Sequence, residues 1–104
     1  MGSRADRWDT FVEHLRSAPA ALPADLRRSI FEAASEGDVS TLPEDLAPFV
    51  DTVARHAYRV TDEQVATLTA GRSQDEVFET TVVAAAGAAD HRLRAALRAM
   101  EDQT

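Results

Sequence analysis

Three places in the chain hold side chains whose types and spacing could support chemistry. Glu32 lies in the largely apolar residues 31–34, where desolvation would raise the pKa of a carboxyl group and suit it to acid–base work. Residues 55–59 read Arg-His-Ala-Tyr-Arg, and residues 90–94 read Asp-His-Arg-Leu-Arg. From these places we take as candidate catalytic residues Glu32, His56 and Arg92, and as candidate binding residues Tyr58 and Arg55.

Each of these places also has a purely structural interpretation. Histidine and arginine are favoured electrostatically at the C-terminus of a helix, so the first basic segment needs no function. Asp90 and Arg94 are four residues apart and would form a surface ion pair on a helix. Arg92 lies on a different face, nearer the apolar residues, and would need a carboxylate partner such as Glu32 or Glu79.

The composition excludes several other kinds of site. The chain has no cysteine, which excludes disulfides, thiolate metal sites and thiol nucleophiles. Its three histidines, His14, His56 and His91, are far apart, so we expect no metal site. No Gly-x-Gly pattern is present to bind a phosphate-bearing cofactor, and we expect no cofactor. The formal net charge of −7 disfavours nucleic acid as a partner.

The length of 104 residues suits a single domain. No run approaches the roughly 18 apolar residues of a membrane span, and the N-terminal residues lack the apolar core of a signal peptide. We therefore expect a cytoplasmic protein with no membrane partner.

The elements that must position the candidate residues are helices. Apolar residues recur at three- and four-residue spacing through most of the chain, which is typical of amphipathic helices, and no stretch shows the alternation of a strand. Helix boundaries are indicated by Pro19, Pro23, Gly37 and Gly71 and by capping boxes at residues 41–44, 61–64 and 73–76.

These signals predict an all-α fold. We expect a compact bundle of five or six helices in which the last and longest helix spans about residues 74–100. Residues 1–20 would be an N-terminal helical extension on a core formed by residues 21–104. Val65 and Leu68 are expected to face inward from the short fourth helix.

The last helix carries one wide apolar stripe. The stripe consists of Val77, Phe78, Thr81, Val82, Ala85, Ala89, Leu93, Ala96, Leu97 and Met100. Residues 82–89 are small and apolar on all sides, which is typical of a helix buried all round, although alanine is also simply a good helix former. One small core can hardly cover both sides, so we expect a homo-oligomer, a dimer or trimer, joined partly through the 74–100 helix. Another protein is the alternative partner.

Four segments of the chain carry a family resemblance. They are His-Ala-Tyr-Arg-Val-Thr-Asp-Glu-Gln-Val at residues 56–65, Gly-Arg-Ser-Gln-Asp-Glu-Val-Phe-Glu at 71–79, Ala-Asp-His-Arg-Leu at 89–93 and Leu-Arg-Arg at 26–28. Through them, residues 42–100 and the preceding helix resemble the alkylhydroperoxidase D-like (AhpD-like), or carboxymuconolactone decarboxylase-like, superfamily. The resemblance implies an AhpD-like helical fold and an oligomeric protein.

The chain departs from this family at the redox motif. Redox members carry Cys-x-x-Cys-x-x-x-His on the third helix, and the matching positions here are Glu44, Ala47 and Asp51. The family's glutamate, about three turns upstream, falls on Glu32, which is the one matching residue.

Two functions follow from this departure. Because thiols are missing, the chain is neither a thiol peroxidase nor a disulfide reductase. We favour a non-redox, oligomeric binding or interaction module that has kept the fold, with a small molecule as a further possible ligand. The alternative is a cofactor-independent acid–base enzyme, of the decarboxylase or lyase type, that uses Glu32 on a small acidic metabolite.

Overall fold

Helices make up the regular structure of residues 4–102, the part of the chain that this computed structural model describes. The helices are α1 (Arg4–Ser17), α2 (Ala24–Glu36), α3 (Ala47–His56), the short 3-10 helix η1 (Ala57–Arg59), α4 (Asp62–Thr69) and α5 (Gln74–Glu101). No strand occurs in this part of the chain. The structure therefore confirms the all-α fold and the long C-terminal helix.

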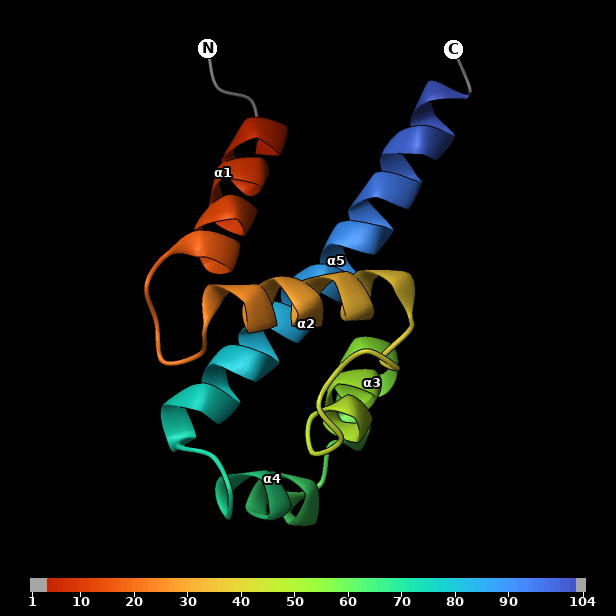
Figure 1. The fold of residues 1–104 in the computed structure, drawn as a ribbon. Coiled ribbons are helices and arrows are strands. Elements are labelled where there is room, and N and C mark those ends of the chain that lie inside the picture. The colour runs from red at the N-terminus through yellow and green to blue at the C-terminus, as the bar shows by residue number, and fades with distance from the viewer. Residues whose placement is uncertain (1–3, 103–104) are drawn as a thin grey trace.

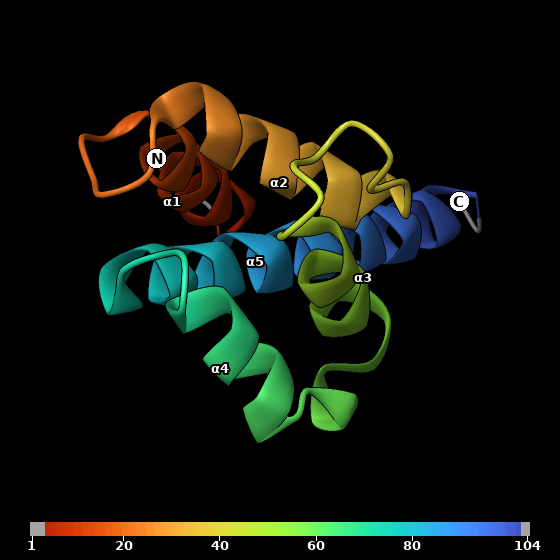
Figure 2. The same cartoon turned by 60° about the horizontal axis from the view of Figure 1, so that its bottom comes forward.

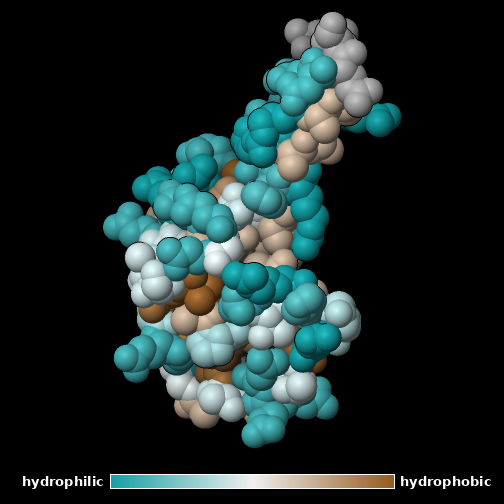
Figure 3. Space-filling view, turned by 90° about the vertical axis from the view of Figure 1, so that its right-hand side faces the viewer, coloured by the Kyte–Doolittle hydropathy of each residue, from teal (hydrophilic) through white to brown (hydrophobic). Residues whose placement is uncertain are grey.

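α5 runs the length of the molecule and organises it. Figure 2 shows α1 and α2 on one side of α5 and α3 and α4 on the other. In Figure 1, α2 crosses α5 near its middle, while α1 and the last part of α5 diverge toward the top of the view. The molecule measures 50 × 28 × 22 Å because the end of α5 projects beyond the other helices, as Figure 3 also shows.

The contact between α2 and α5 is tightest at Gly87. A Cβ atom built at this position would lie 2.4 Å from the backbone oxygen of Phe31 and 3.0 Å from the Cβ of Ala34. Only hydrogen at this position lets the backbone of α2 come so close, which is a common reason for glycine inside a helix. α5 continues through Gly87 without a break.

Two of the three expected capping boxes form as predicted. The Thr61 hydroxyl accepts from the backbone N–H of Gln64, and the Gln64 side chain accepts from the backbone N–H of Thr61. Ser73 and Glu76 make the same reciprocal pair at the start of α5. At the end of α2, Gly37 has φ of 76°, the left-handed conformation that favours glycine at a helix C-terminus.

The third capping box, expected at residues 41–44, does not start a helix, so this prediction is wrong. α3 begins at Ala47 instead, which places Pro48 in the first turn of the helix. A helix that began at residue 42 would have Pro48 beyond its first turn, where proline lacks the N–H for the helical hydrogen bond and its ring clashes with the preceding turn. Residues 44–46 form a turn, and Leu46 is fully buried beneath it.

The chain itself buries only part of the apolar stripe of α5. The residues that α5 buries are Val77, Thr80, Val83, Ala84, Ala86, Gly87, Ala88 and Asp90. Phe78 is 69% exposed and Ala85 and Ala89 are exposed, because α2 packs on the opposite side of the helix, at Gly87. On α4, Leu68 is buried as expected, but Val65 is exposed.

α1 is held against α5 by a buried polar contact. The indole N–H of Trp8 donates to Asp90 at 3.0 Å, and Arg94 Nε donates to the same carboxylate at 2.9 Å. The expected pair between Asp90 and Arg94 therefore forms, but it does not lie wholly at the surface, because Asp90 is only 5% exposed. The carboxylate raises the pKa of Arg94, since it accepts a hydrogen bond from the charged guanidinium.

Candidate functional site

Glu32 lies at the surface. Its side chain is 60% exposed and forms one ion pair, at 3.8 Å, with Arg16 of α1. The guanidinium of Arg16 lies over the ring of Phe31, which positions it for this contact. The desolvation expected of Glu32 is therefore wrong, because its neighbours along α2 are buried while Glu32 itself faces outward. A carboxylate this exposed is not desolvated, and desolvation was the reason to consider it for acid–base chemistry.

The other four candidate residues lie at or beside the C-terminal end of α3. Arg92 donates to the backbone oxygen of Ala54 at 3.3 Å. Arg55 donates to Asp51 and to the backbone oxygen of Gly37. These contacts satisfy carbonyl groups near helix C-termini, which is a structural use of arginine.

The rings of this end of α3 are exposed. His56 and Tyr58 lie edge to face with centroids 5.8 Å apart, and the Arg59 guanidinium lies 5.7 Å from the Tyr58 ring centroid. Tyr58 is 79% exposed. The basic and aromatic candidates thus lie together near the end of α3. Among residues 4–102, however, no carboxylate pairs with Arg92. Glu32 pairs with Arg16, and Glu79 binds the loop between α1 and α2. The expected pairing of Arg92 with either carboxylate is wrong.

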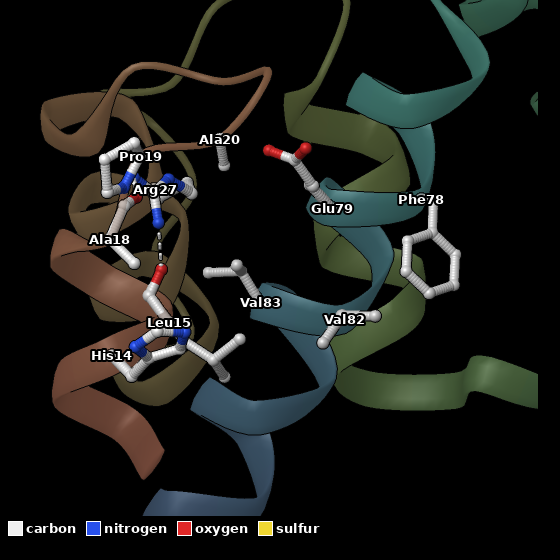
Figure 4. A pocket seen from close by; sticks show the side chains of 10 residues that line it. All are labelled: His14, Leu15, Ala18, Pro19, Ala20, Arg27, Phe78, Glu79, Val82 and Val83. Carbon is white, nitrogen blue, oxygen red and sulfur yellow. Dashed lines mark hydrogen bonds between the residues drawn. The ribbon is translucent and has the colours of Figure 1, made fainter. Parts of the chain in front are cut away.

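The best-formed cavity lies between α1, the loop after it, and α5. It has a volume of about 170 Å³ and is mostly apolar. Figure 4 shows its lining: His14, Leu15, Ala18, Pro19, Ala20, Arg27, Phe78, Glu79, Val82 and Val83. In that view Val83 points into the cavity, while Phe78 and Val82 lie on the outer side of α5.

The two charged groups of this cavity hold the loop between α1 and α2. Arg27, only 3% exposed, donates to the backbone oxygens of Leu22, Leu15 and Ala18. Glu79 accepts from the backbone N–H groups of Ala21 at 3.0 Å and Leu22 at 2.9 Å. A guanidinium and a carboxylate thus satisfy opposite backbone groups of one loop, a role that requires the folded structure and that the sequence did not indicate.

The charged and titratable side chains of this cavity are either engaged or at its edge. Arg27 and Glu79 are occupied by backbone groups, and His14 is an exposed residue at the edge. The apolar walls suit a small apolar group.

A second hollow, of about 300 Å³, lies between α3 and α4 and is lined by Glu44, Asp45 and Glu63 among others. Asp45 is bound by Arg72, whose Nε donates to it at 2.6 Å, and this hydrogen bond lowers the pKa of Asp45. Arg72 also lies 3.6 Å from Glu76. Among residues 4–102, no group of three histidine or acidic side chains is placed to hold a metal ion.

One side of α5 carries apolar side chains that the rest of the described chain leaves uncovered. We call it the open face, and define it as Phe78, Val82, Ala85, Ala89, Leu93, Ala96 and Met100. Steps of three or four residues keep these side chains on one side of the helix. Val82 is half-buried and the other six are exposed, with Phe78 at 69% and Met100 at 66%.

The open face continues into an apolar groove where α1 and α5 diverge. This groove is lined by Arg4, Ala5, Trp8, Leu93 and Leu97. In Figure 3 a line of apolar side chains follows the projecting end of α5 between hydrophilic ones. The sequence analysis found the apolar residues of this helix and expected one small core not to cover all of them, but it could not show which of them the core leaves exposed.

None of the described helices has the combination of length and apolar composition needed to cross a membrane. Comparisons of the chain with protein-family models, with curated proteins and with solved structures found no match. The resemblance to the AhpD-like superfamily thus stays an interpretation of the sequence.

Proposed function

We propose that this chain is a non-redox helical binding module that works as a homo-oligomer, with the open face of α5 as its assembly surface. The observation that carries the proposal is a row of seven apolar side chains along one side of a single helix, six of them exposed and Val82 half-buried. Monomeric proteins rarely expose contiguous apolar patches of more than a few hundred Å², and larger ones are typical of interaction sites. Covering Phe78 and Met100 would remove from water the two most exposed side chains of this face.

The polar groups support binding over catalysis. The two charged residues of the cavity beside α1 are engaged, since Arg27 and Glu79 hold the α1–α2 loop, and the candidate residue Arg92 binds a carbonyl of α3. Without cysteine the chain has no thiol chemistry of its own. The open face of α5 therefore offers a partner apolar area to bury rather than reactive groups.

No observation favours the acid–base alternative. It rests on Glu32, whose surroundings are solvent and one long ion pair with Arg16. Exposed pairs of this kind contribute about 0–1 kcal/mol. Glu32→Gln should change the free energy of unfolding by less than about 0.5 kcal/mol and leave the mass of the assembly unchanged.

The proposal is tested by light scattering at micromolar concentration on the native chain and two variants. Ala85→Glu places a charge on the open face, and Ala95→Glu makes the same change at an exposed position of α5 outside that face. We expect an oligomeric native chain, at least a ten-fold weaker assembly for Ala85→Glu because a buried charge without a partner is costly, and an unchanged mass for Ala95→Glu. A monomeric native chain, or equal masses for all three proteins, would overturn the proposal.

A further inference from the structure

α1 contributes little to the core. Of its 14 residues only Val12 is buried, Trp8, Leu15 and Arg16 are half-buried, and the others are exposed. Among the residues that the structure describes, every buried apolar side chain except Val12 lies outside α1. A segment with so few buried apolar contacts opens at a lower free energy than the rest of a protein. Residues 21–102, which we call the body, thus hold nearly the whole core without α1.

The packing between α1 and α5 is incomplete. The apolar groove lined by Arg4, Ala5, Trp8, Leu93 and Leu97, of about 240 Å³, lies beside the N-terminal half of α1. The cavity of about 170 Å³ lies beside its C-terminal end. Figure 1 shows α1 and the last part of α5 diverging. Side chains that border a hollow lack contacts on one side, so they hold α1 on α5 weakly.

One buried hydrogen bond joins the N-terminal half of α1 to α5. The indole N–H of Trp8 donates to Asp90 at 3.0 Å, and Asp90 is only 5% exposed. A second polar contact, between Asp9 and Arg94 at 3.7 Å, joins two exposed side chains and contributes little. The bond between Trp8 and Asp90 is therefore the buried polar latch of α1.

The C-terminal end of α1 is held more firmly. Arg27, which is 3% exposed, donates to the backbone oxygens of Leu15 and Ala18. In the loop that follows, Glu79 accepts from the backbone N–H of Leu22 at 2.9 Å. Two charge-assisted hydrogen bonds from a buried guanidinium thus anchor this end, against one such bond at the latch. The difference places the hinge of any movement at the C-terminal end of α1.

We propose that α1 is a hinged cover on α5. Residues 4–14 move away when the hydrogen bond between Trp8 and Asp90 breaks, while Arg27 retains the end of the helix and the body keeps its fold. Opening exposes the Asp90 carboxylate and removes the α1 wall of the apolar groove, so the movement controls access to that groove. The inference goes beyond the proposed function, because it concerns the movement of α1 and stands whether or not the chain self-associates.

Hydrogen exchange of the backbone amides in the full chain measures this opening. A helix of about 12–15 residues is marginal in water by itself, so the released segment loses its hydrogen bonds and its amides exchange. We expect the amides of residues 9–14 to exchange at least about ten-fold faster than those of residues 28–34 in α2 and 80–90 in α5. Urea should accelerate the exchange of residues 9–14 less steeply, because opening α1 exposes less surface than unfolding the chain. The N–H of Leu22, bound by Glu79, should be protected like the body.

Val50→Ala separates the opening of α1 from unfolding of the whole chain. Val50 is fully buried in α3, and Figure 2 shows α3 and α1 on opposite sides of α5. The cavity left by the substitution should speed exchange in α2 and α5 by about ten-fold or more. The rates of residues 9–14 should not change, because α1 opens while the body is folded. Equal acceleration in all three helices would overturn the proposal.

Asp90→Ala and Asp90→Asn test the latch. Alanine removes the acceptor of Trp8 and should speed the exchange of residues 9–14 by about five- to ten-fold. Asparagine keeps an acceptor oxygen and should restore most of the native rate, and Asp9→Asn is the control that should leave the rate unchanged. Native rates in Asp90→Ala would overturn the latch. In the native chain, exchange of α1 as slow as that of α5 at every urea concentration would overturn the cover without any substitution.

Discussion

Gly87 of α5 lies so close to Phe31 of α2 that a Cβ atom at position 87 would stand 2.4 Å from the Phe31 backbone oxygen. This contact sets the rotation of α5 about its own axis. With Gly87 turned toward α2, Ala85 and Ala89 necessarily point away from it, and the open face follows. The open face of α5 is thus a consequence of the close approach between the backbones of α2 and α5.

Gly87→Ala should destabilise the fold. Alanine is the better helix former by about 1 kcal/mol, but here its methyl group would collide with rigid backbone, and overpacking of this kind costs about 1–3 kcal/mol. We expect a net loss in the free energy of unfolding, measured by urea denaturation. Gly71→Ala is the control, because nothing lies within 4 Å of its added Cβ. An unchanged or raised stability for Gly87→Ala would show that α2 and α5 are not so closely packed.

Asp90→Ala should loosen α1 from α5. The change leaves the half-buried indole N–H of Trp8 without its acceptor and removes a partner of Arg94. Since a fully buried unsatisfied donor costs about 1–3 kcal/mol, we expect a loss toward the lower end of that range. Trp8 is the only tryptophan, so its fluorescence reports directly on this contact. We expect a red-shifted emission maximum and a lower unfolding midpoint. Asp9→Asn, which removes only an exposed pair with Arg94, should change neither appreciably.

Arg27→Lys should weaken the loop between α1 and α2. Lysine keeps the charge but lacks the planar fork that reaches the backbone oxygens of Leu22, Leu15 and Ala18. We expect a loss of about 1–3 kcal/mol in the free energy of unfolding and faster proteolysis within residues 18–23. Arg28→Lys, at a half-exposed position beside Asp25, is the matched control. Equal proteolysis of the two variants would argue against the anchoring role of Arg27.

The sequence was sufficient for features that depend on neighbouring residues. The capping boxes at Thr61 and Ser73 and the glycine stop at Gly37 are local, and they form as predicted. The start of α3 was mispredicted because Pro48 outweighs the apparent capping box at residues 41–44.

Features that depend on packing between distant segments were not predictable. Alanine and glycine surround α5 on all sides in residues 82–89, so the pattern could not show which side α2 would take. The surface position of Glu32, the burial of Asp90 beneath Trp8 and the anchoring roles of Arg27 and Glu79 depend in the same way on contacts between elements far apart in the chain.

Acid should weaken the contact between Asp45 and Arg72. The hydrogen bond from Arg72 lowers the pKa of Asp45 below its ordinary value of 3.8, so the bond stabilises the fold above that value and is lost as the pH falls through the lower folded pKa. We expect the urea midpoint to fall between pH 6 and pH 3, and to fall less in Asp45→Asn. The difference should be small, since the side chain of Asp45 is 49% exposed. Identical pH profiles for the two proteins would contradict the assignment.

The mass of the native chain in solution tests the central claim most directly. Sedimentation equilibrium over a range of micromolar concentrations gives this mass without a label or a substitution. Self-association through the open face of α5 predicts a dimer of twice the chain mass of 11.3 kDa, which dissociates on dilution. A mass of 11.3 kDa at every concentration would contradict the claim.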